Sequence, residues 1–510
     1  MLNILRVSVT FLDPAPSFHG RADADQPEWP PSPLRLFQAL VAAAASRWQR
    51  ERFKESAQPV LAWLQRQDAP TIVAPRHHVS VPFRIAVPNN DMDVPGSYWA
   101  KRQEPSKPHR PVDLKTMKTV GSSRMCLADI PQGSHIHYLF PLGNGDCPDL
   151  ETLTVAARSI THLGWGVDMV AADVSVLSER ESVALPGEYW RPVSDSSPVV
   201  LRTPIDGTLD ALIATHQAFL SRISVDSKGD ESYSPVPSLS VFRMVGYRRH
   251  GDPAQRPSEV FELQRDGTLF SYPQDRLIHI AGMVRHLAIE AMGRSRPGDV
   301  DKDWVKTYVA GHARAGGTEH RQLSYLPMPS IGHAQTDQSV RRVMIAAPLG
   351  DDQVLLDLAM LLGGQPLKPT PETKLDHPPT LVRVQGDKVA RLYTQPANAW
   401  ASVTPVILPG HDDHKPDKAR KLIEKALAQA GIDQQCEFES SSLSHFPKSL
   451  SAHKYGRDKR PTGYIRPNHL LTQSAVHLKL RFKGGLEVPG PLVIGAGRHC
   501  GFGLMAGVDR

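Results

Sequence analysis

A glycine-rich loop with two basic side chains follows a strand-like apolar run near the end of the chain. It reads Pro491-Leu-Val-Ile-Gly-Ala-Gly-Arg-His-Cys-Gly-Phe-Gly503, and it holds Gly495, Gly497, Arg498, His499, Gly501 and Gly503. Glycine lets a backbone turn sharply and approach a bulky ligand closely. The spacing matches neither a Walker A loop, which ends in Gly-Lys-Ser/Thr, nor a dinucleotide fingerprint, which opens a helix. The loop therefore predicts contacts with the phosphates of a larger ligand.

Positive charge gathers in the same part of the sequence. The 510 residues have a net charge of +6, but residues 441–510 carry eleven Lys and Arg against three acidic residues, a net of +8. A second basic stretch, from Lys101 to Arg124, has seven Lys and Arg against Glu104 and Asp113. Such clustering favours a polyanionic partner, and two stretches together favour nucleic acid over a solvated basic face.

Aromatic residues alternate with charged ones between positions 448 and 466. The basic residues around Tyr455 and Tyr464 are Lys454, Arg457, Lys459, Arg460 and Arg466. This mixture can hold a nucleic-acid backbone by charge while an unpaired base stacks on a ring. A flexible surface loop has the same composition, so both interpretations stay open at this point.

The composition is that of a soluble globular protein, with 40 % hydrophobic and 22 % charged residues. No apolar run approaches the length of a membrane span, and the first residues predict a strand instead of a targeting segment. The four cysteines are far apart and form no Cys-x-x-Cys, which favours a reducing cytoplasm. His411-Asp-Asp-His414 could pass for a metal site, but it falls at a strand-to-helix turn where Asp commonly caps a helix. We expect no metal and no cofactor.

Apolar periodicity predicts how the chain positions these residues. Helical spacing predicts helices over residues 34–48, 150–163, 275–292, 352–362 and 417–430. Strands are expected over 3–12, 135–142, 241–248, 260–263, 342–347, 381–385, 402–408, 436–439, 476–482 and 491–494, and a Gly- and His-rich loop over 311–333. Repeated strand–helix–strand units with antiparallel returns predict an α+β fold of tandem ferredoxin-like (RRM-like) modules that ends in the glycine-rich loop.

Three segments of the chain resemble one protein family. They are Glu28-Trp-Pro-Pro-Ser-Pro-Leu-Arg-Leu-Phe-Gln-Ala-Leu40, the Gly311–His333 loop, and Trp400-Ala-Ser-Val-Thr-Pro-Val-Ile-Leu-Pro-Gly-His411 with the C-terminal loop. In this order they look like the fused subunit of type I-U (also called I-G) CRISPR interference complexes, which belongs to the RAMP superfamily. Phe18-His-Gly-Arg21 departs slightly from the aromatic-His-Ala stretch expected there.

The resemblance implies three modules. Residues 1–200, with a Pro-rich basic insertion, would form a crRNA 5′-handle-binding module. Residues 201–398 and 399–510 would form the two ferredoxin-like modules of a repeat-processing endoribonuclease. The implied partners are crRNA or CRISPR repeat RNA, the other subunits of a Cascade-type complex and, indirectly, target DNA.

The resemblance also implies a metal-independent cleavage in which the ribose 2′-OH attacks the adjacent phosphate. Histidine suits both proton transfers, and Lys or Arg can stabilise the phosphorane charge. Related enzymes place the catalytic histidine at the end of the first helix of the first endoribonuclease module or in the following loop. By that position His312 or His320 is the expected base, Arg314 or Lys306 the phosphate partner, and Tyr325 an orienting group. His499 is an alternative catalytic residue, and a non-catalytic crRNA-binding scaffold is the alternative function.

Overall fold

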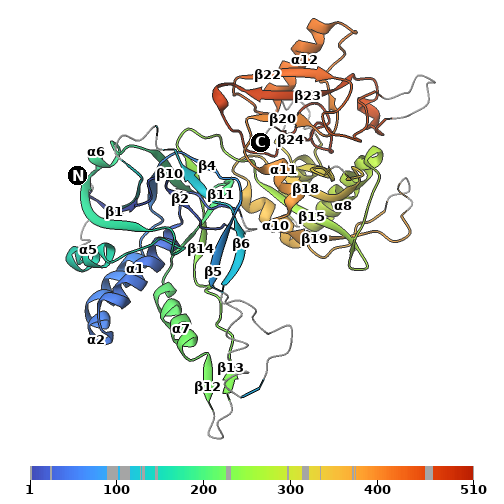
Figure 1. The fold of residues 1–510 in the computed structure, drawn as a ribbon. Helices are drawn as coiled ribbons and strands as arrows, with labels where there is room; N and C mark the ends of the chain where they lie inside the picture. The colour runs from blue at the N-terminus through green and yellow to red at the C-terminus, as the bar shows by residue number, and fades with distance from the viewer. Residues whose placement is uncertain are drawn as a thin grey trace. The chain divides into compact units, whose positions relative to one another are not determined.

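The computed structural model forms two compact units, Met1–Ser194 with Val199–His250 and Asp195–Pro198 with Gly251–Arg510 (Figure 1). The structure describes residues 3–22, 26–88, 102–103, 115–126, 128, 133–143, 148–225, 231–295, 298–312, 321–333, 335–369, 373, 375–453 and 463–508. Both units combine helices with antiparallel sheets, which confirms the predicted α+β class. No helix in these ranges is both long and apolar enough to cross a bilayer.

The first unit is built on a seven-stranded sheet in the order β11-β14-β10-β3-β8-β1-β9. Its strands are β1 (Asn3–Phe11), β3 (Thr71–Ala74), β8 (His135–Leu142), β9 (Val170–Ser178), β10 (Glu188–Val193), β11 (Val199–Thr203) and β14 (Arg243–Arg249). Its longer helices are α1 (Pro33–Arg47), α3 (Gln58–Gln65), α5 (Leu150–Arg158) and α7 (Thr208–Leu220). The β3-β8-β1-β9 part, with α1 after β1 and α5 after β8, has the connectivity of a ferredoxin-like module.

Shorter elements complete the first unit. They are β2 (Ser17–Phe18), β4 (His77–Val79), β5 (Phe83–Pro88), β6 (Lys115–Val120), β7 (Ser123–Met125), β12 (Ile223–Val225), β13 (Glu231–Tyr233), α2 (Arg50–Arg52), η2 (Phe53–Ala57) and α6 (Glu179–Ser182). Because β11 and β14 pair within the first sheet, this unit continues past residue 200 to His250.

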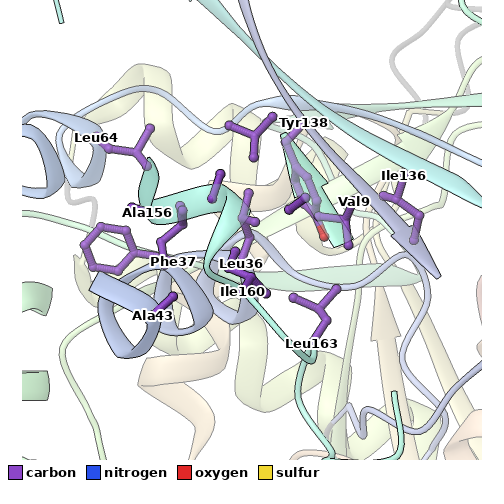
Figure 2. Packing of buried hydrophobic residues seen from close by; sticks show 14 of the residues in the cluster. Val9, Leu36, Phe37, Ala43, Leu64, Ile136, Tyr138, Ala156, Ile160 and Leu163 are labelled. Atoms are coloured by element: carbon purple, nitrogen blue, oxygen red, sulfur yellow. The ribbon is translucent and has the colours of Figure 1, made fainter. Parts of the chain in front are cut away.

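The core of the first unit lies between its sheet and the helices α1 and α5. Alternate residues of β1, such as Val9, point into the same cluster as Leu36 and Phe37 of α1 and Ala156 of α5 (Figure 2). This alternation is the period-two pattern of a strand with one face on a helical layer. The predicted apolar face of α1 is thereby confirmed.

A buried histidine lies in the central sheet of the first unit. His137 on β8 is 6 % exposed, and its Nδ1 lies 2.9 Å from Ser8 Oγ. Burial, followed by the charges of Arg6 and His135, lowers the pKa of His137 from 6.5 to about 4. The neutral ring is therefore the form that the folded protein holds at neutral pH.

We expect this histidine to destabilise the fold as the pH falls from 6.5 to 4. In that window the unfolded chain binds the proton that the folded chain rejects, so unfolding is favoured by up to about 3 kcal/mol at the acid end. Thermal unfolding of the full chain measured from pH 7 to 4.5 should show a smaller decline for His137→Gln than for the wild type. The same change at the exposed His216 is the control. Equal declines in all three proteins would contradict the prediction.

The second unit begins with a complete ferredoxin-like module. Its main elements are β15 (Ser258–Arg265), α8 (Leu277–Ser295), β17 (Ser324–Pro329), β18 (Val340–Ala346), α10 (Asp352–Leu362) and β19 (Thr380–Val384). The strands pair in the order β19-β15-β18-β17, with β16 (Thr268–Leu269) as a hairpin partner of β15. Short elements around them are η6 (Gln274–Arg276), α9 (Asp299–Trp304), η7 (Val305–Val309) and α11 (Lys388–Thr394). Core residues from α8, α10 and one face of the sheet pack together.

Strand β17 corrects one prediction, because it lies inside the segment expected to be a loop. All six of its residues are buried, so it shows no apolar–polar alternation to reveal a strand. It also contains Pro327 and Pro329, which normally argue against a strand. Both prolines are tolerated because β17 is at the edge of its sheet.

The second module of this unit replaces one helix by the glycine-rich loop. Its elements are β20 (Ala399–Ser402), β21 (Val406–Ile407), α12 (Pro416–Gln429), β22 (Cys436–Ser441), η8 (Asn468–Leu470), β23 (Ala475–Phe482), η9 (Lys483–Gly485) and β24 (Met505–Val508). The order β22-β23-β20-β24 is again ferredoxin-like. The return from β23 to β24, residues 483–504, contains η9 and turns where a second α-helix would stand. The strand predicted at 491–494 is wrong, since only Val493 forms an isolated bridge there, with Leu504.

Candidate functional site

The glycines of the C-terminal loop are required by packing within the protein. A Cβ at Gly503 would overlap the carbonyl oxygen of Ile494, and one at Gly495 would lie 2.5 Å from Ile407 O. Both glycines have a positive φ, of 69° and 97°. A side chain at either position would therefore meet backbone atoms and a strained conformation together.

This loop lies along the open edge of β17. The backbone N–H of Tyr325 donates to His499 O at 3.1 Å. A Cβ at Gly501 would lie 2.8 Å from the Pro327 ring and 2.7 Å from Leu277. The loop thus connects the two modules of the second unit and carries His499 to the start of β17.

His499 is held in a short hydrogen-bonded chain. Its Nδ1 lies 3.0 Å from Ser324 Oγ, and that hydroxyl accepts a hydrogen bond of 2.8 Å from Nη2 of Arg256. The guanidinium of Arg256 also donates to Ala347 O at 2.9 Å and to Ala346 O at 3.3 Å. The imidazole and the guanidinium therefore lie beside each other with fixed orientations.

Two arginines at this site have no carboxylate partner in the described part of the chain. The hydrogen bonds of Arg256 go to neutral oxygens, and Nη1 of Arg498 donates to Gly495 O at 3.2 Å. Nη2 of Arg498 is buried without a hydrogen-bond acceptor, in a residue that is 7 % exposed. Burial and then the charge of Arg498 lower the pKa of Arg256 to about 10, and burial lowers that of Arg498. Guanidinium groups that are desolvated and have no carboxylate partner among the described residues favour the binding of an anion.

A tyrosine and a carboxylate adjoin the arginines. Tyr308 on η7 donates its hydroxyl to Asp351 Oδ2 at 2.7 Å, and Arg321 binds the same carboxylate at 2.5 Å. Burial, followed by the hydrogen bond and charge of Asp351, raises the pKa of Tyr308. The carboxylate of Asp351 thus binds Arg321 and Tyr308, whereas the hydrogen bonds of Arg256 go to neutral oxygens.

The structure places several predicted site residues around this chain of contacts. Lys306 is exposed on η7, and the exposed His312 donates its backbone N–H to Lys306 O at 3.0 Å. Tyr325 is 2 % exposed, and its hydroxyl donates to Val309 O at 2.9 Å, so it fixes η7 against β17. The segments that hold Lys306, Tyr325 and His499 are thus hydrogen-bonded neighbours. The predicted residues outside the described ranges are Arg314, His320, Lys454, Arg457, Lys459 and Arg460.

Three other residues that the sequence singled out, Tyr464, Arg466 and Asp412, make hydrogen bonds within the protein. Tyr464 and Arg466 are buried; Tyr464 donates to Gln274 Oε1 at 3.0 Å and Arg466 to Ala452 O at 2.7 Å. Neither ring nor guanidinium is therefore presented at the surface. Asp412 accepts from Ser474 Oγ at 2.7 Å, and the described residues contain no group of three potential metal ligands.

Arg256 and Ser324 were missed by the sequence analysis. Arg256 precedes β15 in the unremarkable stretch Gln255-Arg-Pro-Ser258, and Ser324 opens a strand that the sequence did not reveal. Only the pairing of β15, β17 and β18 in one sheet brings them together. A single sequence holds no local signal for that pairing, because the partners are far apart along the chain.

Comparisons with known proteins give a family and two distant structural likenesses. The model of a family described as "CRISPR-associated protein, GSU0054 family" matches residues 7–507. A solved structure described as "CRISPR associated protein Cas6" is 10 % identical, with a TM-score of 0.29 over 50 % of this chain and 99 % of that one. A CRISPR protein from Archaeoglobus fulgidus is 12 % identical, with a TM-score of 0.21 over 49 % and 93 %. No curated protein matches the chain. The ferredoxin-like character of the modules therefore rests on their strand order.

Proposed function

The chain belongs to the CRISPR-associated GSU0054 family, and from this premise we propose that it binds CRISPR repeat RNA and cleaves it to mature crRNA without a metal ion. We further propose that it stays bound as the fused subunit of a type I-U/I-G interference complex. Its partners would then be crRNA and the other subunits of a Cascade-type complex, with target DNA reached through the crRNA.

The chemistry is an attack of one ribose 2′-oxygen on the neighbouring phosphorus. A base removes the 2′-hydroxyl proton, the new O–P bond closes a 2′,3′-cyclic phosphate, and the bond to the 5′-oxygen breaks. An acid gives that oxygen a proton, so the products are a cyclic phosphate and a 5′-hydroxyl. Extra negative charge on the phosphorane requires a nearby cation.

The observation that carries this proposal is the Arg256–Ser324–His499 chain beside Arg498. It supports the proposal because it joins a proton-transfer group to an arginine that has no carboxylate partner among the described residues. In this assignment His499 transfers a proton, Arg256 stabilises the phosphorane, and Ser324 is a positioning residue. A phosphate would supply the anion that the buried guanidinium groups otherwise lack.

The remaining predicted residues complete the proposed site. His312 or His320 would supply the second proton transfer, and Lys306 or Arg314 a further phosphate contact. Lys454, Arg457, Lys459 and Arg460 would hold the RNA backbone. Gly495, Gly497, Gly501 and Gly503 serve the RNA indirectly in this view. Gly501 lets the loop approach Pro327 of β17, and the other three let the loop pack closely on itself and on β21, so that Arg498 and His499 are placed at the site.

The test is incubation of the purified full chain with labelled repeat RNA from its own locus in EDTA. We expect cleavage at one position, a 2′,3′-cyclic phosphate on the upstream product, and no cleavage when the scissile nucleotide is 2′-deoxy. Tight RNA binding without any cleavage would overturn the catalytic assignment and leave a crRNA-binding scaffold. Failure to bind the RNA would overturn both.

Alanine variants of His312, His320 and His499 assign the proton transfers. We expect two of the three to lose about 10²-fold or more in single-turnover rate, because base and acid each contribute on that scale. Retained rates in all three variants would place the chemistry elsewhere in the chain.

A further inference from the structure

A pocket of about 290 Å³ opens in the second unit, apart from the Arg256–Ser324–His499 chain. Its walls come from the connection between β17 and β18, from α11, from β24 and from the segment that follows β22. The apolar part of the lining includes Ile331, Leu392 and Phe446. This volume is at the lower end for ligand sites, and it suits one flat ring system better than a helix or strand of another protein.

The backbone around the pocket is locked in unusual conformations. Gln338 and Lys448 both line it, with positive φ angles of 61° and 64°. Nε2 of Gln338 donates to Pro447 O at 2.7 Å, and Nε2 of Gln274 donates to Lys448 O at 3.0 Å. Strained residues held in this way cluster at sites that clamp a ligand.

Two basic side chains lie at the same pocket. Lys448 and His333 are both exposed, and Nδ1 of His333 accepts a hydrogen bond from the backbone N–H of Gln335 at 3.2 Å. In the neutral ring this places the proton on Nε2, which can donate to a ligand. The nearby Asp337 is bound by Arg341 at 2.7 and 2.8 Å, so its charge is balanced. An apolar cavity with an aromatic wall and basic groups fits a flat base attached to a phosphate.

We infer that this pocket holds one unstacked RNA nucleotide, with its base against Phe446 and its phosphate near Lys448 and His333. The inference rests on the proposed RNA-binding function. It also follows the charge of the sequence, since residues 441–510 have eleven basic and three acidic residues, a net of +8. A base stacked on an aromatic side chain contributes without regard to its identity, so the pocket would fix the path of the strand.

The test is a double-mutant cycle measured by RNA binding, in which the Phe446 ring and one base of the RNA are removed separately and together. Single-stranded repeat RNA is compared with RNAs that carry one abasic nucleotide, moved stepwise along the strand. At one position we expect the abasic change to weaken binding to the wild type about tenfold or more. In Phe446→Leu the intact RNA should already bind that much more weakly, and the abasic change at that position should cost little more. Phe446→Tyr should restore the wild-type pattern.

The controls separate the possible outcomes. Lys448→Ala should weaken binding, whereas Lys425→Ala, an exposed lysine on α12, should leave it unchanged. Thermal unfolding shows whether Phe446→Leu is folded. If it is not, the abasic series is repeated with Lys448→Ala, whose loss of affinity should be confined to RNAs with an intact base at the sensitive position. Additive losses at every abasic position would overturn the pocket assignment and favour an apolar side chain of a partner protein there. If the wild type does not bind the intact RNA, the proposed function fails together with this inference.

Discussion

Replacing His499 with alanine is expected to slow single-turnover cleavage of repeat RNA by about 10²- to 10⁴-fold, the usual contribution of a positioned acid or base. RNA affinity should change little, because the imidazole acts mainly in the transition state. The fold should survive, since the hydrogen bond from Tyr325 goes to the carbonyl oxygen of residue 499, which alanine keeps. Quenched-flow or gel-based rates, with fluorescence anisotropy for binding, measure the two effects separately.

Variants of the neighbouring residues sharpen this prediction. Ser324→Ala should lower the rate less than His499→Ala does, because it removes a positioning hydroxyl and keeps the imidazole. The matched control is His286→Ala, because His286 is exposed on α8 and pairs with Glu290 at 3.2 Å. If His499→Ala cleaves as fast as His286→Ala, His499 has no proton-transfer role.

Substituting alanine at Gly503 should cost the second unit on the order of 4 kcal/mol or more, enough to prevent folding of a marginally stable protein. The added Cβ would overlap Ile494 O, which is backbone and cannot rotate away. Gly484 is a close control, because its φ of 68° matches the 69° of Gly503, while nothing lies within 4 Å of the place that a Cβ would take there. Gly484→Ala should therefore cost only about 1–2 kcal/mol, the strain of the left-handed conformation.

Chemical denaturation of the two glycine variants measures the difference directly. Equal destabilisation would mean that strain at positive φ, and not the close approach of Ile494, sets the glycine requirement. Yield and solubility provide a second reading if Gly503→Ala does not fold. RNA binding by the folded Gly484→Ala variant serves as a check on the rest of the unit.

The regular elements were largely predictable because their signals are local. The apolar faces of α8, α10 and α12 repeat at helical spacing, and the observed helices match the predicted ranges within a few residues. The exposed position of His286 on α8 could not be predicted in this way, because a lone histidine at a helical position gives no reliable sign of which face it occupies. Strand β17 was not predicted, because all of its residues are buried and the sequence therefore lacks the apolar–polar alternation that reveals a strand.

The candidate site was predictable only in part. Position in the chain pointed to the segments around Lys306, Tyr325 and His499, which the structure joins by hydrogen bonds. The partners of His499 could not be found in this way, because Ser324 and Arg256 are brought to it by strand pairing and by the glycine loop. The glycines themselves predicted close contact with the phosphates of a larger ligand, which stays a prediction; what the structure adds is that these glycines also make close contacts within the protein.

The edge of β17 has a consequence for association between chains. The N–H of Tyr325 points away from β18 and binds the glycine loop, and residues 327 and 329, two and four positions on, share that outward direction. Both are prolines, so this edge offers no amide hydrogen at either position to an incoming strand. Sheet growth by addition of another strand is therefore disfavoured at this side of the module. Pro327 and Pro329, which argued against a strand in the sequence, are thus also the residues that oppose extension of its sheet.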